Sequence, residues 1–372
     1  MSQSPVGRQR SVLVVGTGLA AAATAGFLQQ AGLNPVVATV DCRPKPTEHR
    51  VLWRPGLILL ERMGLRRPVE QVGTRLDSRG CLTADRTWTA EKDTRPSLVA
   101  IDADRLAELV EKYILDTVQT TERVVTGVEP VDSGVRATFD GTVTELFDAV
   151  VTTSRSLLQS RPQKSTTTGL HMWSFKWPTE LPIPSAPSEA WTEQRAVFFD
   201  PVDEVRLVST AEVTSAAALS IGDLERWFGR LFEEQSPFAE LDQECLRYSR
   251  PSQLVPTTVS TDGVVLVGSA ARGSVLGDCL SPTLGLEDAW VLADALAYGP
   301  VEIAAAVDEY EHRRRRRARA IASFVADKSA IDTCPVDTSP SLSRLHARRT
   351  LAFSHVHGGQ PHTLAESIPH RL

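Results

Sequence analysis

The chain has 372 residues, of which 42% are hydrophobic and 23% are charged, so it can bury a large core and form two lobes. Its net charge of -6 argues against nucleic acid as the main partner, because phosphate binding depends on an excess of lysine and arginine. Five scattered cysteines without a Cys-x-x-Cys pair are typical of free thiols in a reducing cytoplasm. After the N-terminal apolar segment, no stretch approaches the roughly twenty apolar residues that span a membrane.

The first predicted elements are a strand, a tight turn and a helix near the N-terminus. The β-branched run 11–15 ends at Gly16 and Gly18, and an alanine-rich helix follows. Gly16 permits the turn, Gly18 lets the backbone approach a pyrophosphate, and Ala21 allows close packing of the helix on the strand. The first helical turn offers unpaired N–H groups and a partial positive charge to phosphates. This arrangement predicts a dinucleotide-binding unit.

A second predicted strand, 36–40, ends at Asp41, twenty residues beyond Ala21. At this place an acidic side chain can accept the hydroxyls of an unphosphorylated adenosine ribose. Two alternatives remain for the N-terminal segment. It could be a secretory signal, although Gly16 and Gly18 interrupt its apolar run and a strand follows at once. It could also be a glycine-containing helix start that binds nothing.

The next elements are predicted to belong to two sheets. Residues 57–65 have a helical pattern that Gly64 can end. Residues 75–100 are short, polar-alternating runs that read as strands of a different sheet. A helix with an acidic first turn begins near Ile101 and continues through Ile114. A meander is predicted at 124–128, 135–139 and 143–147, and a buried strand that returns to the first sheet at 148–151.

The chain then builds its second sheet and comes back to the first. After a polar linker at 154–168, aromatic and β-branched runs separated by prolines predict an antiparallel sheet. These runs lie at 171–177, 196–199 and 205–208, and a helix is predicted at 223–228. A buried strand within 263–271 leads to a helix at 284–297, for which Ser281 can serve as N-cap. The N-terminus of that helix is a second place where free N–H groups can face a ligand.

Four blocks of this sequence resemble the FAD-dependent aromatic hydroxylases of the para-hydroxybenzoate hydroxylase type, the group A flavin monooxygenases. The blocks follow the family's order at 16–41, 53–65, 268–289 and 310–314. The third keeps the family's interval between a strand-end glycine and an Asp-Ala pair, and the fourth has a Tyr-Glu-x-x-Arg pattern. The resemblance implies an α/β fold with a Rossmann-like FAD-binding domain and a second, antiparallel-sheet substrate domain.

The resemblance also implies domain bounds and site residues. The FAD-binding domain is expected at 9–75, 100–160 and 258–328, the substrate-binding domain at 76–99 and 161–257, and a disordered tail at 329–372. The residues expected to bind FAD are Gly16, Gly18, Leu19, Ala20, Asp41, Arg43, Arg105, Gly268, Ser269 and Ser281. NADH or NADPH is a candidate reductant. No metal and no protein nucleophile is required, so no catalytic residue is assigned.

The implied activity is that of a monooxygenase, which hydroxylates or epoxidises a small apolar organic substrate through a flavin C4a-hydroperoxide. Departures from the family's motifs leave a second hypothesis open. Ser269 replaces the aspartate of a Gly-Asp pair, residues 152–155 lack an Asp-Gly pair, and the loop 276–281 has lost glycines that let backbone amides approach the ring. Asp278 would also place a negative charge near a ring that becomes anionic on reduction. The alternative is a non-redox binding or scaffold protein.

A third hypothesis, a flavin-dependent halogenase, is suggested by residues 173–178. It is disfavoured because the two tryptophans there are four residues apart instead of two, and because no lysine corresponds to that of the halogenases. A weak metal signal, His355-x-His357, lacks carboxylate or cysteine partners. Cys279 could be a reactive thiol, but the adjacent Asp278 opposes formation of its thiolate.

Three further groups of residues have both a functional and a structural interpretation. Aromatic residues could line a substrate pocket or, more commonly, pack within a sheet: Trp173, Phe175, Trp177, Phe198 and Tyr248. Arg206 and Arg250 could bind a substrate carboxylate or lie on solvated strand faces. The run Arg313–Arg317, with Arg319, could bind anions or a membrane surface. Its simpler interpretation is one exposed side of a helix whose apolar residues pack inward, namely Val307, Tyr310, Ile321 and Phe324.

Overall fold

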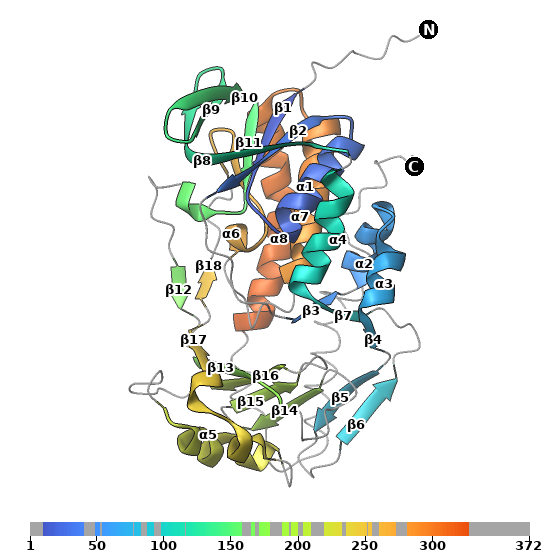
Figure 1. Cartoon of the computed structure of the whole chain (residues 1–372), viewed down its shortest axis with the longest axis vertical. Helices are drawn as coiled ribbons and strands as arrows, with labels where there is room; N and C mark the ends of the chain where they lie inside the picture. The colour runs from blue at the N-terminus through green and yellow to red at the C-terminus, as the bar shows by residue number, and fades with distance from the viewer. Residues whose placement is uncertain are drawn as a thin grey trace.

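The structure is a computed structural model in which the described residues form two lobes (Figure 1). The N- and C-terminal thirds of the chain supply most of the upper lobe in Figure 1, and the middle of the chain supplies most of the lower lobe. The described residues are 10–40, 49–52, 54–76, 78–82, 88–92, 98–115, 117–157, 165–167, 171–178, 188–192, 195–199, 204–209, 219–232, 236–250, 252–254, 260–272 and 281–326.

An eight-stranded mixed sheet is the frame of the first lobe. Its strand order is β10-β9-β8-β2-β1-β11-β20-β19. The bounds are β1 Ser11–Val15, β2 Asn34–Val40, β8 Gln119–Val131, β9 Gly134–Phe139, β10 Val143–Phe147, β11 Ala149–Thr152, β19 Ser260–Thr261 and β20 Val264–Leu266. Five neighbouring strands, β8, β2, β1, β11 and β20, pair in parallel. Their carboxyl ends therefore meet at one edge, which we call the carboxyl edge.

Helices cover one face of this sheet. Helix α1, Leu19–Gln30, lies against α4, Ala103–Leu115, and α7, Ser281–Tyr298, while α7 also packs on α8, Ile303–Ala326. The shorter helices are α2 Arg54–Arg62, α3 Arg66–Val72 and α6 Ser269–Arg272.

Strand β1 is buried on both faces. Val12 and Val14 belong to the core beneath the helices, whereas Leu13 and Val15 belong to the core beneath the β8–β10 meander. A strand covered on both sides reads as an unbroken apolar run, which is the pattern seen in the sequence.

A seven-stranded sheet is the frame of the second lobe. Its strand order is β17-β13-β16-β15-β14-β5-β6, and its pairs are antiparallel except for β14 with β5. The bounds are β5 Ser78–Leu82, β6 Trp88–Lys92, β13 His171–Lys176, β14 Ser188–Thr192, β15 Arg195–Phe199, β16 Glu204–Ser209 and β17 Arg247–Ser249. Helix α5, Ile221–Phe228, covers the face turned away from the first lobe (Figure 1). A capping box between Ser220 and Asp223 fixes the start of this helix.

Two small sheets connect the lobes (Figure 1). The first pairs β12 Ser165–Thr167 with β18 Ser252–Leu254, and the second has β7 Leu98–Asp102 between β3 His49–Leu52 and β4 Thr74–Leu76. Short 3-10 turns lie at Arg155–Leu157, Gly229–Leu231, Pro237–Glu240 and Gln243–Cys245.

The predicted fold class is confirmed: an α/β lobe with a largely parallel sheet carries a separate, mainly antiparallel sheet. The buried strand predicted at 148–151 does return to the first sheet, as β11 beside β1. The strand predicted within 263–271 ends at Leu266, because Gly268 takes a left-handed backbone conformation and α6 follows. Residues 75–100 supply β5 and β6 to the second sheet, but β4 and β7 join the small sheet between the lobes.

The predicted domain bounds stay a prediction, and the tail 329–372 lies outside the described residues. Among the described helices, none combines the length and the apolar composition that crossing a bilayer requires.

Candidate functional site

The turn after β1 fits between the two neighbouring strands. The Gly16 N–H donates to the Ala38 carbonyl on β2 at 3.0 Å, and the Thr153 N–H donates to the Val15 carbonyl at 3.1 Å. Gly16 has a φ of +144°, and a Cβ built there would lie 1.9 Å from the Thr153 hydroxyl oxygen. The protein's own packing therefore excludes any side chain at Gly16.

Gly18 begins α1 and leaves open space beside it. Its φ is +79°, and its carbonyl accepts the N–H of Ala22 at 3.1 Å, which starts the helix. Among the described residues, no atom of the surroundings lies within 4 Å of a Cβ built at Gly18. In the described part of the chain, the half-buried Gly18 therefore leaves space on the side where a Cβ would stand, as a site for close approach of a ligand requires.

The N–H of Gly18 has a partner that the sequence did not indicate. Glu111, in the middle of α4, accepts this hydrogen bond through Oε1 at 3.1 Å. The two residues are 93 positions apart and meet because α4 packs on α1. A carboxylate therefore sits at the positive end of α1.

Two further glycines bring other segments against the first turn of α1. A Cβ at Gly268 would lie 2.9 Å from the Ala20 Cβ, and one at Gly285 would lie 3.3 Å from the same atom. The turn after β20 and the first turn of α7 thus contact α1 at the same spot. Gly285 was not among the predicted site residues, although it falls within the third block of resemblance.

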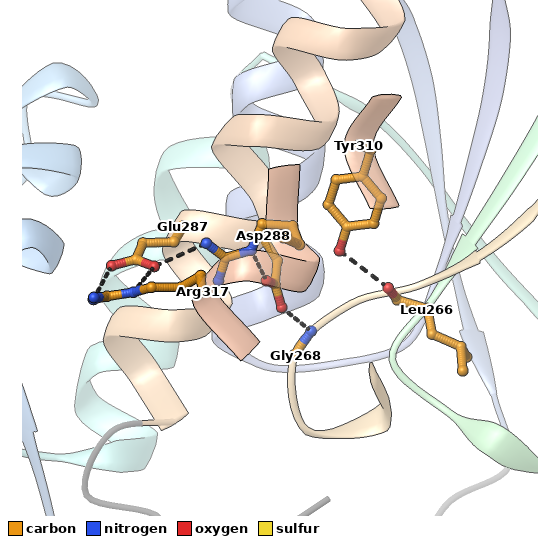
Figure 2. A network of polar contacts seen from close by, with 7 residues as sticks. Leu266, Gly268, Glu287, Asp288, Tyr310 and Arg317 are labelled. Carbon is orange, nitrogen blue, oxygen red and sulfur yellow. Dashed lines mark hydrogen bonds and ion pairs between the residues drawn. The ribbon is translucent and has the colours of Figure 1, made fainter. Parts of the chain in front are cut away.

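Side chains of α7 and α8 hold the turn after β20 (Figure 2). The Gly268 N–H donates to Asp288 Oδ2 at 2.9 Å, and the Tyr310 hydroxyl donates to the Leu266 carbonyl at 3.2 Å. Ser269, the next residue, is exposed at the start of α6. These two hydrogen bonds, with side chains of α7 and α8, therefore fix the backbone that positions Ser269.

Asp288 is part of a buried ionic network (Figure 2). Arg314 donates from Nε to Asp288 at 2.7 Å and from a terminal nitrogen to Glu287 at 2.9 Å, and Arg317 donates to Glu287 at 2.8 Å. Glu287 and Asp288 are each 1% exposed and Arg314 is 6% exposed. Burial lowers the pKa of Arg314, but the charges of Asp288 and Glu287 outweigh burial and hold that pKa above its ordinary value.

This network corrects the simpler interpretation of the arginine run at 313–317 for three of its residues, while Arg315 is exposed as predicted. Arg313 pairs with Asp294, and Arg314 and Arg317 pair with acids of α7, so these three guanidinium groups lie against α7. The reason is tertiary, because the acids that attract them lie on a different helix. Val307 and Tyr310 are buried as predicted, while the side chains of Ile321, Phe324 and Arg319 lie outside the described residues.

The structure brings six of the predicted site residues together at the carboxyl edge: Gly16, Gly18, Leu19, Ala20, Gly268 and Ser269. Ser281 is the first residue of α7, but its side chain lies outside the described residues. Asp41, Arg43 and Cys279, with the loop around it, also lie outside them. Arg105 is exposed in the first turn of α4 and pairs with Glu108 of the same helix at 2.8 Å. Among the described residues, no hydrogen bond or ion pair joins its side chain to the Gly18 turn.

In the second lobe, the aromatic residues pack within the sheet as their simpler interpretation predicted. Trp173, Phe175 and Trp177 are buried in the core under α5, and Tyr248 packs against that core. The side chain of Phe198 lies outside the described residues.

The expectation that Arg206 lies on a solvated strand face is wrong, because Arg206 is only 6% exposed. Arg250 is exposed, as expected. Val205 and Leu207, the neighbours of Arg206 on β16, pack under α5. Because successive side chains of a strand point to opposite faces, Arg206 lies on the face nearer the first lobe (Figure 1).

The buried His171 predicts a pH dependence of stability. Its ring lies 2.8 Å from the Tyr248 hydroxyl, and burial, followed by the charge of Arg250, lowers the pKa of His171. A histidine with a lowered folded-state pKa contributes stability above about pH 6.5, and that stability is lost as the pH falls below this value. Urea unfolding at pH 7.5 and 5.5 measures how much the free energy of unfolding falls between the two pH values. This fall is expected to be smaller for His171→Gln than for the wild type. His312→Gln, at an exposed position on α8, should keep the wild-type loss.

No protein-family model and no curated protein sequence matches the chain. Solved structures do share its fold. HpxO of Klebsiella pneumoniae, complexed with FAD and uric acid, superposes with a TM-score of 0.71 at 19% identity over 97% of this chain and 98% of that one. The tetrameric form of 2-methyl-3-hydroxypyridine-5-carboxylic acid oxygenase gives 0.72 at 19% identity over 95% and 98%. The tetracycline destructase Tet(55) gives 0.70 at 16% identity over 96% and 98%.

Proposed function

We propose that this protein, which has the fold of FAD-binding oxygenases, is an FAD-dependent oxidoreductase of the monooxygenase type acting on a small organic substrate. One observation carries the proposal: the open glycine turn at Gly18 and the fixed turn at Gly268 meet at the carboxyl edge of the first sheet. Ligands of open α/β sheets bind at such an edge. Three of the solved structures that share this fold contain FAD.

The residues present fit the cofactor's adenosine diphosphate half. The N-terminus of α1 supplies backbone N–H groups and a positive end, and Gly18 leaves room for close approach. The exposed Ser269 hydroxyl, on the neighbouring turn after β20, can donate and accept hydrogen bonds with the ribityl chain that follows the diphosphate. When bound, FAD would take electrons from a reductant such as NADH or NADPH and activate oxygen for hydroxylation or epoxidation.

We place the substrate against the face of the second sheet that is opposite α5. That face is turned toward the first lobe and carries the buried Arg206 (Figure 1). HpxO was solved with uric acid, and the oxygenase is named after a pyridine carboxylic acid. A guanidinium on this face suits a ring compound that carries a carboxylate or another acidic group. This face of the second sheet would orient the substrate ring and exclude water, while the cofactor supplies the reactive atoms.

A second candidate function is a non-redox binding protein. Three observations favour it: the Thr153 hydroxyl crowds Gly16, Glu111 occupies the Gly18 N–H, and the neutral Ser269 stands where the resembling family has an aspartate. The absorption spectrum of the purified protein, with FAD added where needed, tests the main proposal against this one. Flavin bands and rapid reduction by NADH or NADPH support the monooxygenase. Bound flavin that is reduced no faster than free FAD supports the binding protein.

Restoring the acidic residue at position 269 is expected to tighten FAD binding. In the resembling family the carboxylate at this position accepts a ribityl hydroxyl of FAD and does not face the diphosphate. A carboxylate accepts a hydrogen bond more strongly than a hydroxyl, by about 1 kcal/mol, so the dissociation constant of Ser269→Asp should fall about fivefold. Quenching of flavin fluorescence measures it. Ser249→Asp, at an exposed strand position in the second lobe, is the matched control and should bind FAD as the wild type does. Equal affinities for the two variants would show that Ser269 does not contact the cofactor.

A further inference from the structure

We propose that Glu111 is an internal competitor of the cofactor's diphosphate: its carboxylate occupies the Gly18 N–H and must leave before a phosphate can bind there. The inference rests on the proposed function, because it concerns how FAD enters the same site. Its observation is the hydrogen bond of 3.1 Å from the Gly18 N–H to Glu111 Oε1.

The backbone of Glu111 cannot move away without disturbing the core. Its neighbours Leu106, Val110 and Ile114 are buried in the main core of the first lobe, which fixes the face that α4 turns to α1. At the C-terminal end of the contact, the Tyr113 hydroxyl lies 2.7 Å from Gln30 Nε2 on α1. Only rotation of the Glu111 side chain can therefore free the Gly18 N–H.

The competition follows from charge and from hydrogen-bond capacity. One N–H cannot serve two anionic acceptors well, and the positive end of α1 attracts a carboxylate as it attracts a phosphate. Once displaced, the half-buried Glu111 carboxylate stays on α4 near the bound diphosphate and repels it. Its negative charge should weaken every ligand that carries a phosphate at this turn, and should not affect a ligand without one.

The weakening of phosphate binding by Glu111 can be measured with Glu111→Gln, which removes the charge and keeps the shape of the side chain. Isothermal titration calorimetry of the full chain with FAD, ADP and adenosine is expected to give about tenfold tighter binding of FAD and ADP to Glu111→Gln. Adenosine, which has no phosphate, should bind the variant and the wild type alike. Glu108→Gln is the matched control, because Glu108 is an exposed carboxylate one turn earlier on α4 and pairs with Arg105. It should change all three affinities less than twofold.

A second readout needs no ligand. Hydrogen exchange of the Gly18 amide should become faster in Glu111→Ala, because its acceptor is gone. The Ala22 amide, which donates to the Gly18 carbonyl, should exchange as before. Unchanged exchange at Gly18 would show that the contact does not hold in solution and would overturn the proposal.

The failure of this inference differs from the failure of the proposed function. If wild type and Glu111→Gln bind FAD equally, or the variant binds it more weakly, Glu111 is no competitor, but the protein remains a flavoprotein. If neither the wild type nor Glu111→Gln nor Glu111→Ala binds FAD or ADP, the cofactor site itself is refuted and the competitor with it.

Discussion

Replacing Arg314 with methionine is expected to lower the free energy of unfolding by about 3–5 kcal/mol, the range found when one partner of a buried ion pair is removed. Methionine keeps much of the volume but leaves Asp288 without its guanidinium and Glu287 with Arg317 alone. Both carboxylates are 1% exposed, so water cannot replace the lost partner. Urea unfolding monitored by circular dichroism measures the change.

The matched control is the next arginine on the same helix. Arg315 pairs with Glu311 one turn away, and its side chain is 46% exposed. Arg315→Met removes the same charge and should cost about 0.5 kcal/mol or less. Similar losses for the two variants would mean that the network around Asp288 contributes no more than a surface pair.

The Arg314 network also connects α8 to the candidate cofactor site. Arg314 holds Asp288, and Asp288 accepts the N–H of Gly268, whose turn presents Ser269. Arg314 therefore acts as a positioning residue for this turn.

The second large effect is expected at Gly16. Gly16→Ala should lower the free energy of unfolding by about 2–4 kcal/mol, because it combines overpacking with an unfavourable backbone conformation. The new methyl group would lie 1.9 Å from the Thr153 hydroxyl oxygen, and alanine rarely adopts a φ of +144°. Thermal and urea unfolding of purified variants provide the measurement.

A double variant separates the two causes. Thr153→Ala removes the hydroxyl that a Cβ at Gly16 would meet, so Gly16→Ala/Thr153→Ala should recover part of the lost stability. Recovery should stay incomplete, because the backbone strain at position 16 remains. Full recovery would mean that strain contributes nothing, and no recovery would mean that Thr153 is not the neighbour that excludes a side chain.

The local part of the candidate site could be predicted from the sequence. The unbroken apolar run of β1, the two glycines and the alanine-rich helix specify strand, turn and helix through short-range sterics alone. The observed φ values at Gly16 and Gly18 are those that favour glycine. The apolar run also predicted the buried strand before Gly268, whereas the resemblance implied the position of Gly268 at the end of that strand.

Local sequence patterns did not predict the burial of Arg314, in the arginine run, or of Arg206. A run of five arginines on a helix looks solvated, yet Arg314 is buried because two acids on another helix face it. Arg206 alternates with apolar residues of β16 as a solvated residue does, but its side chain is buried in the folded chain. Periodicity identifies a face of an element and does not say what lies against that face.

By itself, the sequence determined the two-sheet α/β fold and the glycine turns, because apolar periodicity and the φ preference of glycine act within a few residues. Only the tertiary structure decided which charges meet. Glu111 and Gly18 are 93 residues apart, and Arg314 and Asp288 are 26 apart, so their contacts arise from helix packing. Charge pairing acts through space between side chains whose neighbours are set by the whole core, and no local pattern encodes it.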